Sequence, residues 1–226
     1  MPELRQNANC ILITKKQTIK SKKLIYCVVK RCIDLLLSLI AMPIYLIIYS
    51  FIAAVAKFTD GGPVLYKSAR IGKGGKSFYM YKFRTMKINA DKLEDFLTPE
   101  ELEKYKKEYK LENDPRVTGI GNILRKTSLD ELPQILNVIK NDMSFIGPRP
   151  VLDEETQLYG KDRNILLSIK PGLTGYWQAY ARNDVGYTDG RRQKMELYYI
   201  NNRSLKFDAK IFFATIRRVL SGKGVF

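Results

Sequence analysis

The residues that could carry out chemistry centre on Asp130 and Glu131, two adjacent carboxylates within residues 127–134. Pro133 is poorly tolerated deep inside a helix, so we expect a helix to begin at or just before Glu131, with Asp130 near its N-cap. Free backbone N–H groups at a helix start stabilise an ionised carboxylate and attract phosphate. Asp130 is therefore a candidate nucleophile or metal ligand. The alternative is that Asp130 only caps the helix, because Ser128 and Glu131 also have capping-box spacing.

Two adjacent carboxylates also suit Mg²⁺, which binds one or two protein carboxylates while keeping waters and substrate phosphate oxygens. We therefore expect Asp130 and Glu131 to be the metal ligands, with the ion offsetting charge repulsion as Asp130 attacks phosphorus. The chain contains no histidine, which removes the commonest general base and every Ser-His or Cys-His nucleophile pair. Catalysis must then depend on carboxylates, Lys, Arg, Tyr or a hard metal ion.

Arg149 is the leading candidate for binding phosphate. It lies between Pro148 and Pro150, whose fixed φ angles lower the cost of ordering its guanidinium, and the planar fork fits phosphate oxygens. An ordinary proline-rich turn is the alternative. Trp177 is a candidate for stacking on a base, with a core position as its alternative. Substrate binding is also predicted for other basic residues: Lys82, Arg84, Arg116 and Arg125.

Composition limits the class of protein and its partners. The chain has 226 residues, 45% of them hydrophobic, enough for one packed domain with an added membrane element. The net charge of +16 implies an acidic partner, which could be nucleic acid, an anionic membrane face or a phosphorylated substrate. Cys10, Cys27 and Cys32 fit neither a disulfide framework nor a zinc site, which favours a reducing cytosolic setting.

One apolar segment is long enough for a membrane. Residues 35–56 carry no charge over 22 positions, and a straight helix of that length spans roughly 33 Å, against about 30 Å of hydrocarbon core. Pro43 removes a backbone donor and clashes with the carbonyl of Leu39, so we expect a break at Met42 and Pro43.

The flanks of this segment bear on its topology, because Lys and Arg concentrate on the cytoplasmic side of spanning helices. Residues 1–31 carry eight Lys or Arg against one Glu, and residues 57–87 carry eight against one Asp. A helix that enters the membrane and returns to the cytoplasmic face satisfies both flanks. A single spanning helix and a buried core helix are the alternatives.

The remaining chain predicts a compact domain with a basic arm before it. Residues 1–23 are predicted to be a polar, basic arm that touches anionic lipid, 24–57 the membrane helix and 58–226 the cytoplasmic domain. The domain is expected to contain a β-hairpin of strands 64–70 and 77–83 joined by a simple turn at residues 72–75. Three helices are expected: one over 98–110 that starts with a capping box of Thr98 and Glu101, one from about Glu131 to near Asn141, and an amphipathic basic helix over 207–220. The last could lie in the bilayer interface or pack in the core.

At these residues the chain resembles the bacterial sugar transferase family, the monotopic phosphoglycosyl transferases that act on polyprenyl phosphate. The resemblance covers about residues 24–226. It is carried by these motifs: Lys30-Arg31, Lys82-Phe83-Arg84-Thr85-Met86, Asp114-Pro115-Arg116, Ser128-Leu129-Asp130-Glu131-Leu132-Pro133-Gln134, Gly147-Pro148-Arg149-Pro150 and Pro171-Gly172-Leu173-Thr174-Gly175.

The resemblance implies an α+β, mainly helical fold with a re-entrant membrane helix and a compact cytoplasmic catalytic domain, a small β-hairpin and interfacial amphipathic helices. It implies transfer of a sugar 1-phosphate from a UDP-sugar to undecaprenyl phosphate at the cytoplasmic membrane leaflet, with UMP leaving. In family terms Asp130 would form a phosphosugar-aspartyl intermediate, Glu131 would be its partner, and Mg²⁺ would neutralise the diphosphate.

Two features depart from the family pattern. Met42 stands where the family often has Ser before the proline, and Ser38 is the candidate to compensate. Larger members carry extra spanning helices and another domain, so this chain is expected to be the compact form, with separate chains such as downstream glycosyltransferases as partners. The sugar is expected to be read by loops around residues 176–187.

A membrane-anchored basic protein that binds nucleic acid or anionic lipid without catalysis is the competing class. Its motivation is the basic residues interleaved with Tyr and Phe in residues 64–87. The enzyme reading predicts no nucleic-acid partner, so the two classes make opposite predictions for oligonucleotide binding.

Overall fold

The computed structural model describes residues 2–59, 61–108, 111, 114–181 and 190–221, with side chains described outside residues 2–23, 59, 106–108 and 220. The fold is mainly helical, with two small sheets, so the α+β prediction is confirmed. The α-helices are α1 (Pro2–Thr59), α2 (Pro99–Glu108), α3 (Gly119–Thr127), α4 (Ile135–Ile139), α5 (Asp153–Gln157), α6 (Arg163–Leu166), α7 (Tyr176–Ala181), α8 (Arg191–Asn202) and α9 (Leu205–Leu220). The strands are β1 (Leu65–Ile71), β2 (Ser77–Phe83), β3 (Ser144–Ile146) and β4 (Gly172–Thr174).

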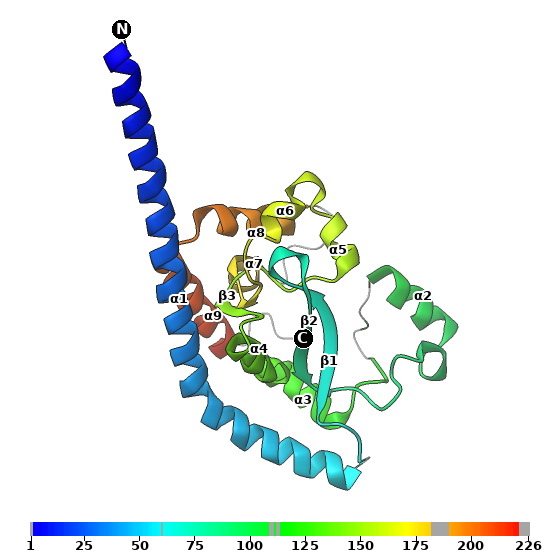
Figure 1. Ribbon diagram of the computed structural model, residues 1–226. Helices are drawn as coiled ribbons and strands as arrows, with labels where there is room; N and C mark the ends of the chain where they lie inside the picture. Colours follow the sequence, from blue (N-terminus) through cyan, green and yellow to red (C-terminus); the bar gives the residue numbers. More distant parts are fainter. Residues whose placement is uncertain (1, 60, 109–110, 112–113, 182–189, 222–226) are drawn as a thin grey trace.

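Helix α1 runs along one side of the domain and bends in the part that carries Pro43 (Figure 1). Residues 42 and 43 stay helical, so the predicted break is a bend and not an interruption, as expected where one backbone hydrogen bond is lost within an otherwise intact helix. Ser38 donates to the carbonyl of Asp34 at 2.8 Å, so this bond does not serve the carbonyl that Pro43 leaves without its donor.

The backbone of α1 also extends further back than the sequence suggests. It is helical from Pro2, whereas residues 1–23 were expected to form an arm without regular structure. Residues 3–23 contain neither glycine nor proline, so nothing in their backbone chemistry stops a helix from continuing.

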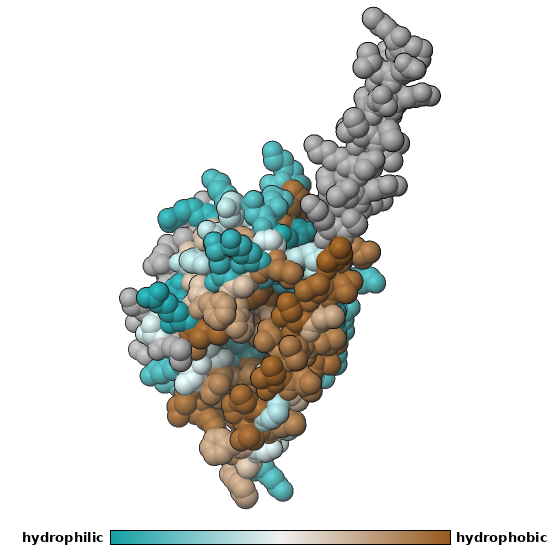
Figure 2. Space-filling view, turned by 90° about the vertical axis from the view of Figure 1, so that its left-hand side faces the viewer, coloured by the Kyte–Doolittle hydropathy of each residue, from teal (hydrophilic) through white to brown (hydrophobic). Residues whose placement is uncertain are grey.

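Most of the described apolar surface of α1 faces outward. The stretch Leu24–Phe58 is long and apolar enough to cross a membrane, and Figure 2 shows apolar side chains gathered over this face of the molecule. Side chains such as Leu39, Ile47 and Phe51 are each at least 65% exposed. A continuous apolar surface of this size is unfavourable in water, so α1 associates the chain with a membrane.

The opposite face of α1 packs on the domain. Tyr45 and Ile52 are buried against Phe83 of β2, Leu124 of α3 and Ile135 of α4, and the rings of Tyr45 and Phe83 stack with centroids 6.1 Å apart. This second face makes the membrane helix a part of the domain's core.

Polar contacts also fix α1 against the domain. The carboxylate of Asp34 accepts hydrogen bonds from Ser144 Oγ and the N–H of Phe145, both at 3.0 Å. Arg31 donates to the carbonyls of Val138 and Ile139 at 2.6 and 3.0 Å. Arg31 and Asp34 are three positions apart on the helix and could pair with each other, but each instead contacts β3 or α4, which come from distant parts of the chain.

A second polar contact joins α1 to the C-terminal helix. Asp208 of α9 accepts from Lys30 at 2.8 Å, from Tyr26 at 2.9 Å and from Tyr199 of α8 at 2.7 Å. Asp208 is buried, so its charge is balanced by Lys30 within the fold. Together these bonds connect α1, α8 and α9 at one point.

Strands β1 and β2 form the antiparallel hairpin that the sequence predicts, paired from Leu65 with Phe83 to Ile71 with Ser77. The turn between them contains Gly74 and Gly75 with positive φ angles of 73° and 77°, which side chains rarely adopt. The stretch 72–75 is therefore a simple turn, as expected.

Strands β3 and β4 form a parallel pair that the sequence did not predict. Gly147, after β3, and Gly172, at the start of β4, approach so closely that a Cβ on Gly147 would lie 2.6 Å from the N of Gly172. This contact brings the Gly-Pro-Arg-Pro motif beside the Pro-Gly-Leu-Thr-Gly motif, although 20 residues separate them.

Helix α9 is the predicted amphipathic helix, and its contacts show whether it packs in the core or lies apart from it. Ser204 caps it by accepting from the N–H of Phe207 at 3.2 Å, and Ile211 is fully buried in a core cluster with Tyr199 and Ile200 of α8. The other side exposes Phe213. The helix therefore packs in the core and still presents an apolar face outward.

Helix α2 has the expected capping box, in which Thr98 and Glu101 exchange bonds of 2.9 and 3.3 Å.

Candidate active site

The two candidate catalytic carboxylates lie beside a strand lysine. Asp130 and Glu131 belong to a 3-10 helix, η3 (Leu129–Gln134), which packs against β2. Lys82 of β2 places its ammonium 2.9 Å from Glu131 Oε1 and 3.9 Å from Asp130 Oδ2. All three side chains are mostly buried, with 14–24% of their surface exposed. The ammonium of Lys82 thus lies next to both carboxylates, in a place where all three side chains have little exposure to water.

The local backbone differs from the predicted helix start. Ser128 has a left-handed φ of 57° and makes no side-chain cap, and the 3-10 turn already begins at Leu129. Asp130 therefore lies within the first turn and is not an N-cap, and the predicted capping box of Ser128 and Glu131 does not form. The reason is that α3 ends at Thr127 and the chain must reverse at once. Lys82 supplies the positive potential that a long helix start was expected to provide.

A cavity of about 280 Å³ opens beside Glu131, and Asp130, the neighbouring residue, is not among its lining residues. Its basic lining residues are Lys82, Arg70 of β1, Arg149 and Arg218 of α9, and Glu131 also lines it. Apolar side chains form much of the remaining wall: Met80, Leu129, Leu132, Phe145, Leu173, Phe212, Ile216 and Val219. A cavity with several guanidinium and ammonium groups and an apolar wall suits an anion that carries an apolar part.

Alternation along the hairpin explains part of this lining. Met80 and Lys82 are two residues apart on β2 and so project from the same face. Phe83 projects to the other face, where it is buried against α1. One strand thereby serves the cavity with one face and the membrane helix with the other.

The turn with Arg149, the predicted phosphate-binding residue, lies at the cavity. The N–H of Gly147 donates to Thr174 at 2.9 Å, and the N–H of Gly172 donates to Pro148 at 2.8 Å. These bonds tie the turn to β4. The N–H of Arg149 itself donates to Glu196 Oε1 of α8 at 3.1 Å.

The other predicted substrate-binding residues do not line the cavity. Arg84 donates to the carbonyl of Pro63 at 2.7 Å, and Arg125 donates to Thr85 Oγ1 at 3.0 Å. Both therefore support loops near the hairpin. Their motifs indicated basic residues at the site, but the direction of each side chain depends on neighbours that the motifs do not contain.

Arg116 is a structural residue. It is 2% exposed and binds Asp114 at 2.6 and 2.8 Å, with Tyr105 against its guanidinium at 4.5 Å. Burial raises the pKa of Asp114, but the hydrogen bonds and charge of Arg116 outweigh it, so the pKa lies below its ordinary value. This closed pair leaves Arg116 away from the cavity.

Trp177 takes the core position that was its alternative. It is buried, and the guanidinium of Arg192 lies 4.7 Å from its ring centre, with that of Arg149 at 5.9 Å. Its ring therefore faces arginines of the protein. Of the expected sugar-recognition stretch, residues 182–187 lie outside the described residues.

Sequence reasoning missed Arg70, Gln178 and Arg218 as lining residues. Arg70 was read only as part of a strand and Arg218 only as part of a basic helix. No local signal distinguishes them, because three separate elements bring them to one cavity.

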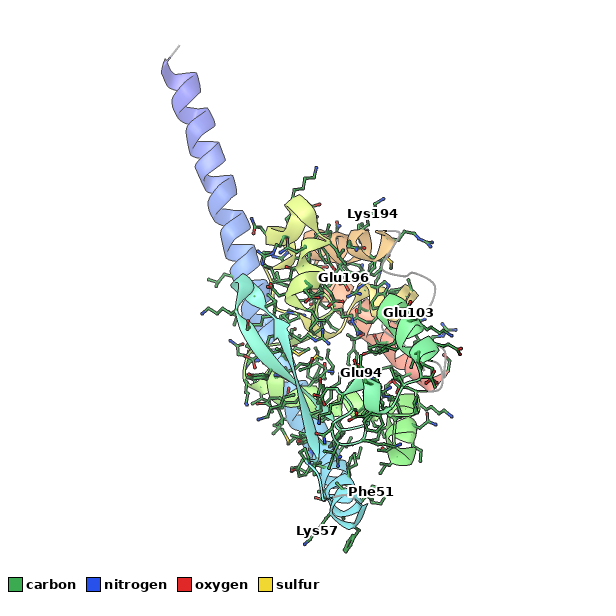
Figure 3. All side chains as sticks on the ribbon, turned by 90° about the vertical axis from the view of Figure 1, so that its right-hand side faces the viewer. Phe51, Lys57, Glu94, Glu103, Lys194 and Glu196 are labelled. Atoms are coloured by element: carbon green, nitrogen blue, oxygen red, sulfur yellow. The ribbon has the colours of Figure 1, made fainter. Side chains whose placement is uncertain are left out.

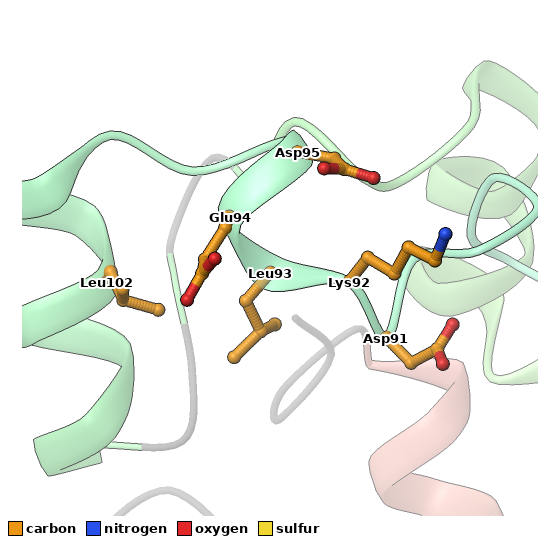
Figure 4. A pocket seen from close by; sticks show the side chains of 6 residues that line it. All are labelled: Asp91, Lys92, Leu93, Glu94, Asp95 and Leu102. Carbon is orange, nitrogen blue, oxygen red and sulfur yellow. The ribbon is translucent and has the colours of Figure 1, made fainter.

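A separate depression is lined by Asp91, Glu94 and Asp95 with Lys92, Leu93 and Leu102 (Figure 4). It shares no lining residue with the cavity at Glu131. Its acidic side chains belong to the connection before α2, and we assign it no part in the chemistry.

The carboxylate oxygens of Asp130 and Glu131 are donors of the kind that Mg²⁺ prefers. Among the described residues, no group of three or more acidic, Cys or His side chains gathers to enclose a metal ion. Asp130 and Glu131 provide two carboxylates beside a basic cavity, which fits an ion that completes its shell with waters and substrate phosphates. Such an ion would have to share the space that Lys82 reaches.

A carboxylate pair beside a cation-lined cavity, in a domain built onto a membrane-associated helix, is an arrangement that suits the binding of phosphorylated molecules at a membrane. The family model described as "Bacterial sugar transferase" matches residues 25–222. The chain therefore belongs to the bacterial sugar transferase family, as its motifs suggested.

Similar proteins are known from several bacteria. The chain is 44% identical over 86% of its length to the exopolysaccharide production protein ExoY of Rhizobium meliloti, covering 87% of that protein. It is 44% identical over 74% of its length to an undecaprenyl-phosphate galactose phosphotransferase of Salmonella typhimurium, of which it spans 35%. It is 37% identical over 88% of its length to a UDP-N-acetylgalactosamine-undecaprenyl-phosphate N-acetylgalactosaminephosphotransferase of Aeromonas hydrophila, spanning 45%.

Proposed function

We propose that this protein transfers a sugar 1-phosphate from a UDP-sugar to undecaprenyl phosphate and releases UMP. The observation that carries the proposal is the carboxylate pair at Lys82, next to a cavity with arginines from β1, α9 and the Arg149 turn. These cations suit the two phosphates of a nucleoside diphosphate sugar. The names of two relatives, which include undecaprenyl phosphate, support the same acceptor.

The cavity wall also suits a lipid-linked acceptor. Ile216 and Val219 of α9 line the cavity and are themselves 41% and 51% exposed. An apolar wall that continues to the outer surface allows a polyprenyl chain to leave the cavity toward lipid while its phosphate stays near the arginines. Polymers such as exopolysaccharide, capsule or glycoconjugate would be built on the product, and downstream glycosyltransferases would extend it.

In the proposed first step a carboxylate oxygen of Asp130 attacks the phosphorus that bears the sugar. The bond from this phosphorus to the bridging oxygen breaks, and UMP leaves with that oxygen. In the second step a phosphate oxygen of undecaprenyl phosphate attacks the same phosphorus and releases the carboxylate of Asp130. Lys82 holds Asp130 and Glu131 in position through its contacts with both carboxylates.

Asp130 and Glu131 would hold Mg²⁺, which supplies charge neutralisation to the diphosphate when bound. Lys82 and Arg149 are retained as substrate-binding residues because both line the cavity, and Arg70 and Arg218 join them. Arg84, Arg116 and Arg125 receive no such role, since none of them lines the cavity.

For the membrane helix we propose entry from, and return to, the cytoplasmic leaflet of the bacterial inner membrane. The bend at Pro43 and the basic residues on both flanks support this arrangement. Cys27 and Cys32 are exposed and provide labelling sites on one flank, and Lys57→Cys provides one on the other. We expect a membrane-impermeant thiol reagent to reach both flanks from the cytoplasmic side, and labelling of Lys57→Cys from the opposite side would contradict re-entry.

The transfer reaction is tested by incubating the purified full chain with undecaprenyl phosphate, Mg²⁺ and a panel of UDP-sugars, and measuring UMP. We expect release with at least one sugar. Asp130→Asn should lower turnover by about 10³-fold or more while leaving thermal unfolding unchanged. Absence of UMP from the whole panel would reject the reaction, and full activity of Asp130→Asn would reject the nucleophile. Salt-sensitive oligonucleotide binding without UMP would favour the noncatalytic alternative.

A further inference from the structure

The turn 148–150 contains a single backbone N–H group. Pro148 and Pro150 lack N–H groups, so Arg149 supplies the N–H of this three-residue stretch. That N–H donates to the carboxylate of Glu196, on α8, at 3.1 Å. The direction of the Arg149 backbone, and with it the origin of its side chain, therefore depends on a residue 47 positions later.

Glu196 is buried in the domain interior. It is 0% exposed, whereas Lys194 on the same helix lies at the surface (Figure 3). Its second carboxylate oxygen, Oε2, has no hydrogen-bond partner among the described residues. Burial raises the pKa of Glu196 to about 7, and the N–H of Arg149 together with the charges of Arg192 and Arg149 opposes this rise. A carboxylate kept in this costly position needs a structural or functional reason.

Charged side chains near Glu196 also connect α8 with the cavity. Arg192, one turn earlier on α8, is 1% exposed and lies over the ring of Trp177. Its guanidinium is 3.9 Å from Glu155 Oε1, and the other oxygen of Glu155 is 3.6 Å from Arg70. Arg70 and Arg149 both line the cavity, so the buried charges of α8 lie directly behind two of its cations.

We propose that Glu196 is a positioning residue that holds the Arg149 turn so that the guanidinium meets the diphosphate of the nucleotide substrate. This inference rests on the proposed function, because it assigns Arg149 to that diphosphate. Glu196 does not touch the substrate in this scheme. Its effect passes through the single backbone bond to Arg149, and substrate affinity is the quantity that it controls.

The test uses UDP binding to the full chain in detergent, measured by calorimetry. Glu196→Gln keeps an oxygen acceptor for the N–H of Arg149, whereas Glu196→Leu removes it at similar volume. We expect Glu196→Leu to weaken UDP binding by about tenfold or more, and Glu196→Gln to stay within about threefold of the wild type. With a UDP-sugar, Glu196→Leu should raise KM more than it lowers kcat.

A double-mutant cycle separates positioning from general damage. If Glu196 acts through Arg149, then Glu196→Leu should change UDP affinity less than about twofold when Arg149→Ala is already present. If the Leu variant does not fold, Glu196→Asp replaces it, since the shorter side chain retracts the carboxylate from the same N–H. Additive losses in the cycle, or an equal loss in Glu196→Gln and Glu196→Leu, would overturn the proposal.

The two proposals fail differently. If the wild-type chain binds UDP but releases no UMP from any UDP-sugar, the proposed reaction is rejected. The double-mutant cycle on UDP affinity then still tests the role of Glu196. A chain that turns over with an additive cycle would keep the reaction and reject the role of Glu196. Failure of the wild type to bind UDP would reject the positioning role outright.

Discussion

Lys82 places a positive charge next to both carboxylates of the pair Asp130 and Glu131. Two carboxylates next to each other in sequence repel, and one of them would tend to take up a proton. The ammonium of Lys82 lies within 4 Å of both and attracts each carboxylate. At the scale of single residues, the site therefore consists of three groups, of which the sequence motif 127–134 contains two.

Replacing Lys82 by Met keeps the length of the side chain and removes its charge. We expect UMP release to fall by about 100-fold or more, because the carboxylates lose the cation that balances them. Lys140→Met is the matched control, since Lys140 is exposed and contacts Tyr81 on the neighbouring strand position. Steady-state rates for both variants, with melting curves, measure the difference. Equal rates for the two variants would contradict the role of Lys82.

Arg116 provides the opposite case, a motif arginine with a structural role. We expect Arg116→Met to lower the free energy of unfolding by about 3 to 5 kcal/mol, since it leaves Asp114 buried without its cation. UDP affinity of the folded fraction should stay unchanged because Arg116 does not line the cavity. Denaturant unfolding and calorimetry test the two halves of this expectation. Weakened UDP binding in a stably folded Arg116→Met chain would return Arg116 to the site.

At the scale of elements, the most consequential contact is between α1 and β3. Asp34 bonds Ser144 and Phe145, and the chain then passes through Ile146 into the turn with Arg149. Two hydrogen bonds thus join the membrane-associated helix α1 to β3, the strand that leads into the turn with the cavity residue Arg149. The parallel pairing of β3 with β4 fixes the other side of the same turn.

We expect Asp34→Ala to lower stability by about 2 to 5 kcal/mol, because it leaves two buried donors without an acceptor. Asp34→Asn retains one oxygen and should cost clearly less. Ser50→Ala is the control on the exposed side of the same helix, where Ser50 bonds only within α1, and its effect should be within about 0.5 kcal/mol. Urea unfolding in detergent compares the three. Similar losses for Asp34→Ala and Ser50→Ala would contradict the brace between α1 and β3.

At the scale of the whole molecule, α1 belongs both to the membrane and to the core. Its outward side chains need lipid, while Tyr45 and Ile52 fill the cluster formed with Phe83, Leu124 and Ile135. The predicted boundary between the membrane helix (24–57) and the domain (58–226) therefore separates two environments, whereas the core is shared across it. This is why the exposed apolar surface and the cavity are held in one fixed relation.

A chain of residues 58–226 should consequently fail to fold on its own. Losing α1 exposes the apolar faces of β2, α3 and α4, and it removes the acceptor of Ser144. We expect this truncation to aggregate or unfold without cooperativity, as read by circular dichroism during heating. A chain that starts at residue 24 is the control, since the first 23 residues were assigned no chemistry, and it should unfold cooperatively. A soluble, active 58–226 chain would contradict the shared core.

The sequence by itself determined the chemistry that was available and the main elements that carry it. The absence of histidine, the pair Asp130 and Glu131 and the turn at Arg149 follow from residue types, and types do not depend on folding. The hairpin, helix α9 and the apolar helix α1 follow from local periodicity and turn residues, which act over a few positions. Family membership followed from the order of the motifs.

The tertiary structure alone decided which basic residues meet the carboxylates. Lys82 reaches them, Arg116 is closed off by Asp114, and Arg70 and Arg218 line the cavity next to Glu131 from other elements. It also decided that β3 pairs with β4 and that Glu196 holds Arg149. These are contacts between residues far apart in the chain, and their energies depend on burial and on exact neighbours, which no local pattern of residues specifies.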